Sequence, residues 1–449
     1  MKNQAIIGFS NKASAGIAYT LFFFILAFPA ASGLYLVKGV LLGTVILLIV
    51  ASALVKGRFT LHPTVGLLTV CFASFGFILV LRGLLVESPG AAKMSGVFVV
   101  WPFVYLLLVG GVGNMRVLRN LEKTVVFSAV FIGSLAILFF LSQVKLIPEI
   151  PYFDSLLPDN DVAIGFYEGY IRMALPGINS LPFVVPFLMA AVVVHSLQTN
   201  KISLSIGWLW VALLLSAFVT IVSGRRAIVV VTFLAPLLIL VLAFLQPPRE
   251  RIFLMKSLGR FLVTLTAGTL LLVLLIRPIY SITFEGFLDR FSSGFDFSAT
   301  SVDNSPDERR QQYFALERGW LEHPIFGAGL GEPAYGSVRS QEMPWAYELS
   351  YLALLFQTGL LGLFTYASGI AWIYWTSAKI MRRGGQWARV MLPLLVGMTC
   401  YLIANATNPY LTKFDGLWAI FLPIAAVNLW LVERETSSSY SSALVARPT

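Results

Sequence analysis

The chain has few charged residues and very few of the side chains that build metal sites or disulfide frameworks. Only 12% of its 449 residues are charged, two are cysteine and three are histidine. Cys71 and Cys400 both lie inside apolar runs, with no CxxC pair and no Cys/His cluster nearby. This pattern excludes a disulfide framework and a zinc site, and the scarcity of charge excludes an ordinary soluble protein of this length.

Motifs for nucleotide binding are absent as well. The chain contains neither a GxxxxGK[ST] phosphate loop nor a GxGxxG dinucleotide motif, so an ATP-driven machine is excluded. It also lacks an internal repeat of the kind found in many secondary transporters. The sequence therefore predicts neither a cofactor nor a bound metal.

Long apolar runs are the main feature that is present. Hydrophobic residues make up 57% of the chain, and runs of about 18 or more apolar residues can cross the hydrocarbon core as helices. The sequence predicts an all-α integral membrane protein of about twelve transmembrane helices, with a large periplasmic loop that contains short amphipathic helices. The predicted helices cover residues 15–32, 34–55, 62–82, 95–113, 124–143, 181–198, 203–222, 226–245, 260–280, 346–377, 389–407 and 416–432, and the first two could instead be one interrupted helix.

The basic residues predict the orientation, because lysine and arginine resist translocation. With the N-terminus in the cytoplasm, the short loops agree with an even number of spans and with both ends inside. The net charge of +10 then reflects topology and contact with anionic lipids rather than nucleic-acid binding. Six regions result: helices 1–5 in 1–143, a periplasmic loop in 144–180, helices 6–9 in 181–280, a large periplasmic loop in 281–345, helices 10–12 in 346–432, and a disordered cytoplasmic tail in 433–449.

Two adjacent arginines in the stretch VSGRRAIVVV lie on the side where this bias disfavours them. Arg225 and Arg226 stand at the extracytoplasmic start of a predicted helix. They either extend to lipid phosphates or bind an anionic substrate, to which the helix N-terminus adds its positive partial charge. Paired guanidinium groups suit bidentate phosphate binding, which favours the substrate.

The stretch DERRQQYFALERGWLEHPIFGAGLGE predicts an amphipathic helix at the membrane interface, followed by a glycine-rich turn. Arg309 and Arg310 either pair with the acids beside them or face the same anion as the first arginine pair. His323 precedes a proline, which is typical of a tight turn, but histidine chemistry makes it a further candidate for catalysis.

A single carboxylate stands before the apolar run of WAYELSYLALLFQTG. Glu348 is either a charge at a helix start, which the helix dipole favours, or a general base, provided that Trp345 and Tyr347 shield it from water. Spacing alone leaves both interpretations open, and Tyr347 is a further candidate. Lys413, in the outside loop TNPYLTKFDG, either contacts glycan or phosphate or is simply solvated.

Taken together, these segments resemble the superfamily of O-antigen ligases and Wzy-type O-antigen polymerases. Arg226 in SGRRA matches the Ser-Arg-Gly type helix start of that family, and Arg309 matches an arginine that lies fourteen residues before a His-Pro pair. ELSYLALLFQTGLLG looks like the family's His-Asn-Ser-Tyr-Leu helix with its following Gly-Leu-Leu-Gly. The likeness covers roughly residues 200–380 by motif and the whole chain by predicted topology.

The resemblance implies a metal-independent glycosyl transfer at the periplasmic face of the bacterial inner membrane. The implied partners are an undecaprenyl-diphosphate-linked glycan donor, a glycan acceptor, membrane lipids and a chain-length regulator. Membrane glycosyltransferases of this kind would use arginines to bind the donor diphosphate and a base to activate the acceptor hydroxyl. The residues that take these roles here are Arg225, Arg226, Arg309, Arg310 and, as the base, Glu348.

One departure from the family pattern bears on the activity. Glu348 and Leu349 stand where the ligases carry histidine and asparagine, which favours a polymerase that joins lipid-linked repeat units over a ligase that transfers glycan to lipid A-core. A transporter of lipid-linked oligosaccharide is the alternative of another class. It would require intramembrane charges along a path, whereas the sequence shows only Lys38 and Arg82 near span ends.

Overall fold

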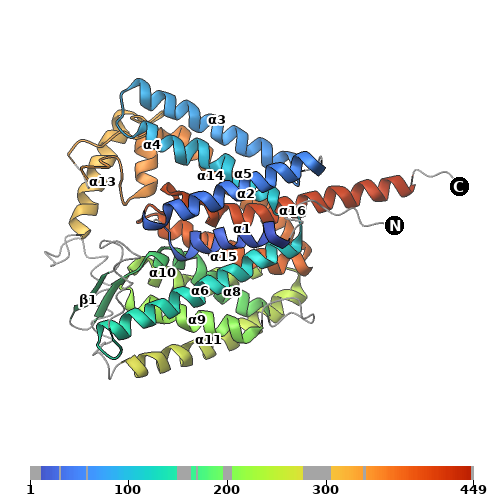
Figure 1. The fold of residues 1–449 in the computed structure, drawn as a ribbon. Helices are drawn as coiled ribbons and strands as arrows, with labels where there is room; N and C mark the ends of the chain where they lie inside the picture. Colours follow the sequence, from blue (N-terminus) through green and yellow to red (C-terminus); the bar gives the residue numbers. More distant parts are fainter. Residues whose placement is uncertain are drawn as a thin grey trace.

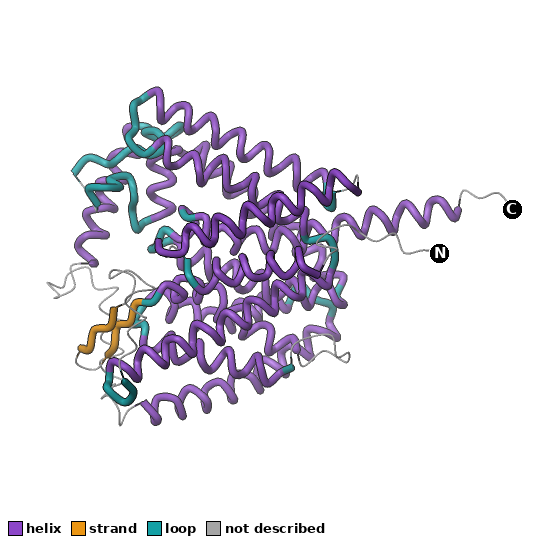
Figure 2. Tube along the Cα trace, viewed as in Figure 1, coloured by secondary structure: helices purple, strands orange, loops and turns teal. Residues whose placement is uncertain are grey.

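The protein is a bundle of helices with one small β-hairpin (Figures 1 and 2). The structure, a computed structural model, describes residues 12–29, 32–56, 59–148, 163–167, 170–195, 205–276, 305–336 and 340–445. The first half contains α1 (Lys12–Ala27), η1 (Ser32–Leu34), α2 (Tyr35–Lys56), α3 (Pro63–Leu85), α4 (Ala91–Ser95), the π-helical stretch η2 (Gly96–Val100), α5 (Trp101–Gly111), α6 (Met115–Gln143), β1 (Ala163–Tyr167), β2 (Tyr170–Ala174), η3 (Pro176–Ser180) and α8 (Leu181–His195). The second half contains α9 (Ile206–Val222), α10 (Arg226–Ala243), α11 (Pro248–Ile276), α13 (Ser305–Glu322), α14 (Ser350–Arg383), α15 (Gly385–Asn405), η4 (Tyr410–Thr412) and α16 (Phe414–Val445).

A helix overlaps each of the twelve ranges that hydropathy predicts, and α1 and α2 are separate helices. Within the described residues, nine segments are long and apolar enough to cross a membrane, and shorter apolar helices cover Ser14–Ala27 and Ile206–Val222. By length and composition, this is a mostly helical protein of the multi-pass membrane class.

Two helices begin earlier than hydropathy predicts. Helix α6 starts at Met115 rather than near residue 124, and α11 starts at Pro248 rather than near residue 260. Both extra segments are rich in arginine, lysine and glutamate, which lower hydropathy but are good helix formers. In α6 the Asn114 side chain also accepts a hydrogen bond of 3.0 Å from the backbone N–H of Val117, which caps the new start.

The mostly helical structure agrees with an all-α membrane protein, and two parts of the chain differ in detail from the predicted regions. The predicted loop 144–180 contains the antiparallel hairpin of β1 and β2, in which Ala163 pairs with Ala174, so the fold is not purely helical. The predicted disordered tail 433–449 is helical to Val445 as a continuation of α16, while residues 446–449 lie outside the described part. The helix continues because neither glycine nor proline occurs between Pro423 and Pro448.

The core lies where α8 crosses α15. In the apolar segment Pro176–His195, 89% of an 18-residue stretch is buried, whereas the share in the segment Tyr35–Val55 is only 17%. Phe183 of α8 packs edge-on against Trp418 of α16, with ring centroids 4.6 Å apart. Gly397 of α15 permits this approach, since a Cβ there would lie 2.9 Å from the Phe183 ring. Tight central packing thus fixes the helices whose ends carry polar residues.

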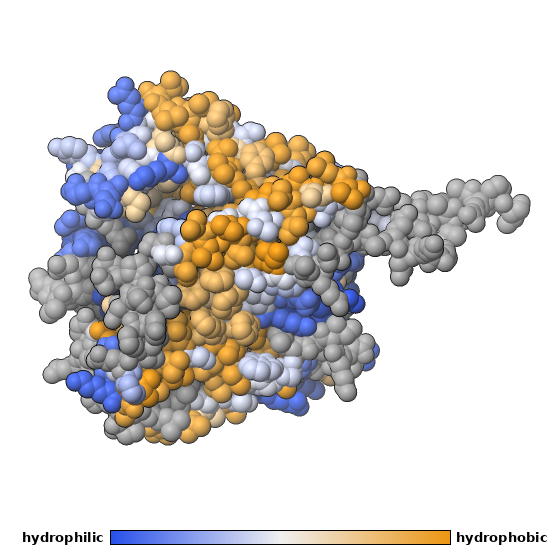
Figure 3. Space-filling view, viewed as in Figure 1, coloured by the Kyte–Doolittle hydropathy of each residue, from blue (hydrophilic) through white to orange (hydrophobic). Residues whose placement is uncertain are grey.

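The outer helices expose aliphatic side chains to the surroundings. Leu36 and Leu54 of α2 and Leu67 of α3 are each more than half exposed. Figure 3 shows such residues as an apolar band across the middle of the molecule, with polar residues toward its ends. A soluble protein rarely exposes a patch of this extent, whereas a hydrocarbon environment favours it.

The two ends of the bundle differ in structure. The hairpin and α13 lie at one end, called here the hairpin end, while the last part of α16 projects from the opposite end (Figure 1). The long segments 144–180 and 281–345 therefore contribute their described elements to the same end of the bundle. Residues 281–304 of the second segment lie outside the described part.

Helix α14 is kinked at Gly359, and the glycine-rich turn after α13 hydrogen bonds to the backbone groups that the kink leaves without helical partners. Gly359 has a φ of +66°, so its backbone leaves the helix there. The N–H of Leu360 donates to the carbonyl of Pro324 (2.9 Å) and the carbonyl of Phe356 accepts from Ala328 (2.8 Å). The turn thereby satisfies backbone groups that the kink releases, which ties α13 to the start of α14.

The structure confirms that the glycine-rich segment after α13 forms a turn. Gly327, Gly329 and Gly331 all have positive φ, and a Cβ at Gly331 would lie 2.3 Å from the carbonyl carbon of Gly90. The guanidinium of Arg82 donates to the carbonyl of Gly327 at 2.6 Å. These contacts fix the turn between α3, α4 and α14 and leave no space for a side chain.

A buried ion pair joins α2 to the start of α16. The Lys38 ammonium lies 2.6 Å from a carboxylate oxygen of Asp415, and the two side chains are 6% and 8% exposed. Lys38 also donates to the carbonyl of Phe28 at 3.2 Å. Lys38, which the sequence places near a span end, is therefore paired within the bundle.

Breaking this ion pair should destabilise the fold more than removing both charges. Lys38→Met leaves the Asp415 carboxylate buried without its cation, at an expected cost of roughly 3–5 kcal/mol. The double variant Lys38→Met/Asp415→Asn removes both charges and should recover part of that loss. Thermal unfolding of the purified protein in detergent measures the effect, and equal stabilities of the two variants would contradict it.

Candidate functional site

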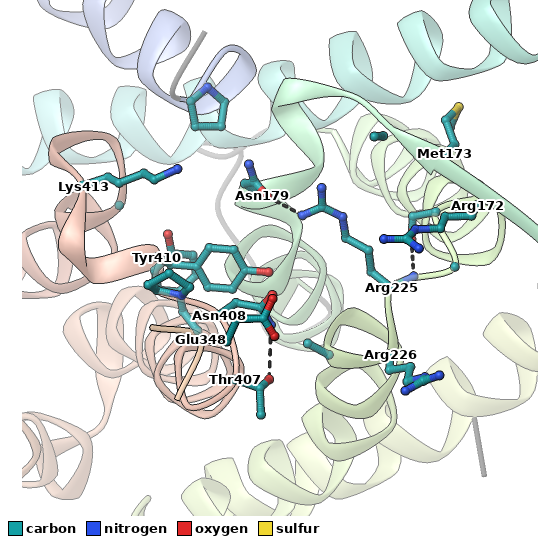
Figure 4. A pocket seen from close by; sticks show the side chains of 18 of the residues that line it. Arg172, Met173, Asn179, Arg225, Arg226, Glu348, Thr407, Asn408, Tyr410 and Lys413 are labelled. Carbon is teal, nitrogen blue, oxygen red and sulfur yellow. Dashed lines mark hydrogen bonds between the residues drawn. The ribbon is translucent and has the colours of Figure 1, made fainter. Parts of the chain in front are cut away.

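A cavity of about 620 Å³ opens at the hairpin end of the bundle. Its walls come from the hairpin and η3, the junction of α9 and α10, the start of α13, the segment before α14, and the connection between α15 and α16. Figure 4 shows the arginines of α10 and β2 on one wall and residues of the α15–α16 connection on the facing wall. The polar lining residues are Arg172, Asn179, Ser223, Arg225, Arg226, Glu308, Arg309, Glu348, Tyr401, Thr407, Asn408, Tyr410, Lys413 and Asp415.

A sharp turn places Arg225 and Arg226 at the cavity. Gly224 has a φ of +59°, and a Cβ there would lie 2.7 Å from the carbonyl oxygen of Ile171 in β2. Arg225 precedes α10 as its capping residue and Arg226 begins the helix, as the sequence predicts. The Arg225 guanidinium donates to the side-chain oxygen of Asn179, which aims it across the cavity (Figure 4).

Arg309 and Glu348 meet at the cavity from two different helices. The Nε of Arg309 in α13 donates to Oε2 of Glu348 at 2.6 Å, with the two side chains 27% and 16% exposed. The backbone N–H of Glu348 donates to Oε1 of Gln312, one helical turn after Arg309, at 2.9 Å. Helix α13 therefore holds both the charge and the backbone of Glu348. Glu348 lies two residues before Ser350, the first residue of α14, close to the predicted helix start.

The connection between α15 and α16 forms the facing wall. Asn405 accepts from the backbone N–H of Leu411 at 2.9 Å and so shapes this segment. Tyr410 lies close enough to Arg225 for the guanidinium charge to act on its hydroxyl. Burial raises the pKa of Tyr410, the Arg225 guanidinium opposes that rise, and the charge of Glu348 adds to it. The Tyr410 hydroxyl thus stays protonated near neutral pH.

Lys413 and Asp415 extend the same wall. Lys413 is exposed and lines the cavity. Asp415 also lines the cavity, where the buried ion pair with Lys38 anchors it. This anchor fixes the end of the segment from which Lys413 projects.

Three predicted candidates do not reach the cavity. Arg310 is exposed, and its guanidinium lies 5.9 Å from the Phe314 ring centroid. Consecutive helical residues point about 100° apart, so Arg309 and Arg310 face different directions. His323 is exposed at the end of α13, as expected of a turn residue. Tyr347 is buried against α13, and its hydroxyl accepts from the backbone N–H of Ala334.

Trp345 and Tyr347, which the sequence suggests as shields for Glu348, make their contacts outside the cavity. Trp345 packs against Gly90, whose Cβ position would lie 2.4 Å from the indole, and Lys93 lies 5.3 Å from the ring centroid. Neither Trp345 nor Tyr347 lines the cavity. Burial raises the pKa of Tyr347, but its hydroxyl serves the turn before Ala334 rather than Glu348.

Several residues that line the cavity were not predicted from the sequence. Arg172 lies on β2 in the predicted loop 144–180, and its charge on the side disfavoured by the positive-inside rule was a usable signal. Asn179, Asn408 and Thr407 carry no such signal, because their only distinction is their position in space. These three side chains add neutral hydrogen-bond donors and acceptors to the charged lining of the cavity.

The balance of charge favours an anion. Of the residues that the structure describes, five cationic side chains line the cavity, namely Arg172, Arg225, Arg226, Arg309 and Lys413, against the three carboxylates of Glu308, Glu348 and Asp415. Convergence of guanidinium groups is unfavourable without a counterion, and their geometry suits bidentate contacts with phosphate oxygens. Among the described residues, no group of three or more His, Cys, Asp or Glu side chains is placed to hold a metal ion.

Comparison with known proteins adds no assignment. No protein-family model matches the chain, and no curated protein sequence is detectably similar to it. A functional proposal for this chain therefore rests on the geometry of the cavity and on the motifs of the sequence.

Inorganic pyrophosphate should bind the cavity and stabilise the protein against heat. At one hundred times its dissociation constant, a ligand adds about 2.7 kcal/mol. Arg225→Ala and Arg226→Ala should each weaken the affinity about tenfold, which is typical of one lost charge-assisted hydrogen bond. Arg310→Ala removes an equal charge outside the cavity and is the matched control. Equal losses in all three variants would contradict an anion site at this position.

Proposed function

We propose that the protein is a glycosyltransferase that uses a lipid-diphosphate-linked glycan as donor, and specifically a polymerase of O-antigen or exopolysaccharide repeat units. The observation that carries this proposal is that Arg225, Arg226, Arg309 and Glu348 line one cavity. A diphosphate donor needs cations and an acceptor hydroxyl needs a base. Residues of α10, α13 and the segment before α14 line this cavity together, which supports the assignment of both roles to it.

In the proposed reaction, the arginines bind the diphosphate of an undecaprenyl-diphosphate-linked glycan. A hydroxyl of the acceptor sugar gives its proton to Glu348, and its oxygen forms a bond to the anomeric carbon of the donor sugar. The bond between that carbon and the diphosphate oxygen breaks at the same time. The lipid diphosphate leaves with the electron pair, and the guanidinium groups offset its developing charge, a role that other enzymes give to a metal ion.

The proposed location is the bacterial inner membrane, with both termini in the cytoplasm and the cavity at the periplasmic face. The positive-inside rule supports this orientation. The positive-inside rule assigns two long segments to the outside, and both contribute their described elements to the hairpin end. Helix α16 projects from the other end. All twelve predicted helices would then cross the bilayer.

A ligase that transfers glycan to lipid A-core is the second candidate, since it would use the same donor and the same cavity. The carboxylate Glu348 in place of a histidine favours the polymerase. Deletion of the gene separates the two: loss of long polymer supports a polymerase, whereas accumulation of long lipid-linked polymer without surface glycan supports a ligase.

A transporter of lipid-linked oligosaccharide is the alternative of another class. It would need ionisable residues along a path between the two ends, whereas Lys38 and Asp415 are paired and buried. Purified protein in vesicles with lipid-linked donor distinguishes the activities. A product of higher mass without ATP supports the enzyme, and movement of intact donor alone supports transport.

Glu348→Gln and Arg226→Ala should abolish polymer formation in a host that lacks the native gene. Loss of a general base typically lowers a rate by about 10²–10⁴-fold, which would remove the ladder of polymer lengths on a gel. His323→Gln changes an exposed residue outside the cavity and should leave the ladder intact. Ladders that persist unchanged in the first two variants, at normal protein levels, would reject the proposed function.

A further inference from the structure

The proposed base and one proposed donor ligand already bind each other. Nε of Arg309 donates to Oε2 of Glu348 at 2.6 Å, a short distance typical of a charge-assisted hydrogen bond. Each group neutralises the other in this arrangement. Arg309 presents less net charge to an incoming anion, and one oxygen of Glu348 is engaged by a cation when an acceptor hydroxyl needs it.

The surroundings make this pair exchangeable rather than permanent. The Arg309 side chain is 27% exposed and that of Glu348 is 16% exposed, so water reaches both. By contrast, the Lys38–Asp415 pair is 6% and 8% exposed, and its cation Lys38 does not line the cavity. A diphosphate carries more negative charge than one carboxylate and offers several acceptor oxygens, so it competes favourably for a guanidinium within reach.

The backbone of Glu348 has its own support, which does not depend on this pair. Its N–H donates to Oε1 of Gln312 at 2.9 Å, and Gln312 is only 2% exposed. Glu348 therefore keeps its place beside the cavity when its side chain is released. The other arginines of the cavity, Arg225 and Arg226, approach from α10 and can hold the anion while Arg309 changes partner.

From these contacts we propose that Arg309 exchanges between two anions: it binds Glu348 while the cavity is empty and the donor diphosphate once the cavity is loaded. This inference rests on the proposed function and describes how that site is regulated. Donor binding removes the guanidinium from Glu348 and leaves the carboxylate oxygen able to accept the acceptor proton. The base becomes available only in the presence of donor, which orders the reaction with donor first and acceptor second.

The test is the affinity of the full-length protein in detergent for inorganic pyrophosphate, measured by calorimetry. Glu348→Gln keeps the shape of the side chain and removes its charge, so Arg309 is no longer held by a competing anion. The affinity should rise about tenfold, although the same variant loses glycan transfer. A damaged or misfolded variant would not bind more tightly.

Glu308→Gln is the matched control, because Glu308 lines the same cavity and carries the same charge. This variant measures how much the pyrophosphate affinity rises when any one negative charge is removed from the cavity, and that rise should be at most about twofold. In an Arg309→Gln background, Glu348→Gln should add no more than Glu308→Gln does. Comparing Glu348→Gln in the wild-type protein and in the Arg309→Gln variant thus separates the competition for Arg309 from the general effect of cavity charge on affinity.

An equal gain in pyrophosphate affinity in Glu348→Gln and Glu308→Gln would overturn the exchange. Weaker pyrophosphate binding in Glu348→Gln would overturn it too, because it would show that Glu348 holds Arg309 in place for the anion. Failure of the proposed function has a different signature. If pyrophosphate binds with the expected pattern but no variant or wild-type protein transfers glycan, the exchange stands as a property of an anion site and the transferase assignment falls. Absence of pyrophosphate binding in every form overturns both.

Discussion

The contact between the glycine-rich turn after α13 and the Gly359 kink of α14 is the constraint on which this side of the cavity depends. Helix α13 has few apolar residues of its own, and Arg309 in its first turns also pairs with Glu348, before the start of α14, at 2.6 Å. The rest of α13 is tied to α14 through the glycine-rich turn, whose backbone groups replace those lost at the Gly359 kink. Because the kink and the turn satisfy each other, the start of α14 is held at a fixed distance from α13. A carboxylate and a guanidinium can then share one small space.

A second constraint acts on the opposite wall, where the connection between α15 and α16 would otherwise be a free surface loop. The Lys38–Asp415 pair anchors its end inside the bundle, and Asn405 shapes its middle. Buried ion pairs contribute little net stability compared with apolar residues, but they penalise any arrangement that leaves one charge alone. This pair therefore specifies the position of the wall more than it strengthens the fold.

The cationic wall comes from elements that are distant in the chain but meet at the hairpin end. Arg172 belongs to β2, while Arg225 and Arg226 belong to the turn into α10, and Gly224 lets that turn contact the β2 backbone directly. Bringing guanidinium groups together is unfavourable unless an anion compensates. The facing wall supplies Tyr410, whose hydroxyl is influenced by the Arg225 charge. The site thus combines several cationic side chains with neutral polar groups.

The sequence by itself determined the helices and the chemistry available at one end of the bundle. Apolar length predicted where helices lie, because a backbone in hydrocarbon must bond internally, and the placement of Arg225, Arg226, Arg309, Glu348 and Lys413 came from helix starts and loop composition. Only the tertiary structure decided which charges meet. Arg309 faces the cavity and Arg310 does not because neighbouring helical side chains diverge by about 100°, and Tyr347 turns into the α13–α14 contact. Arg172, Asn179 and the Lys38–Asp415 pair depend on contacts between segments far apart in the chain, which no local pattern of residues encodes.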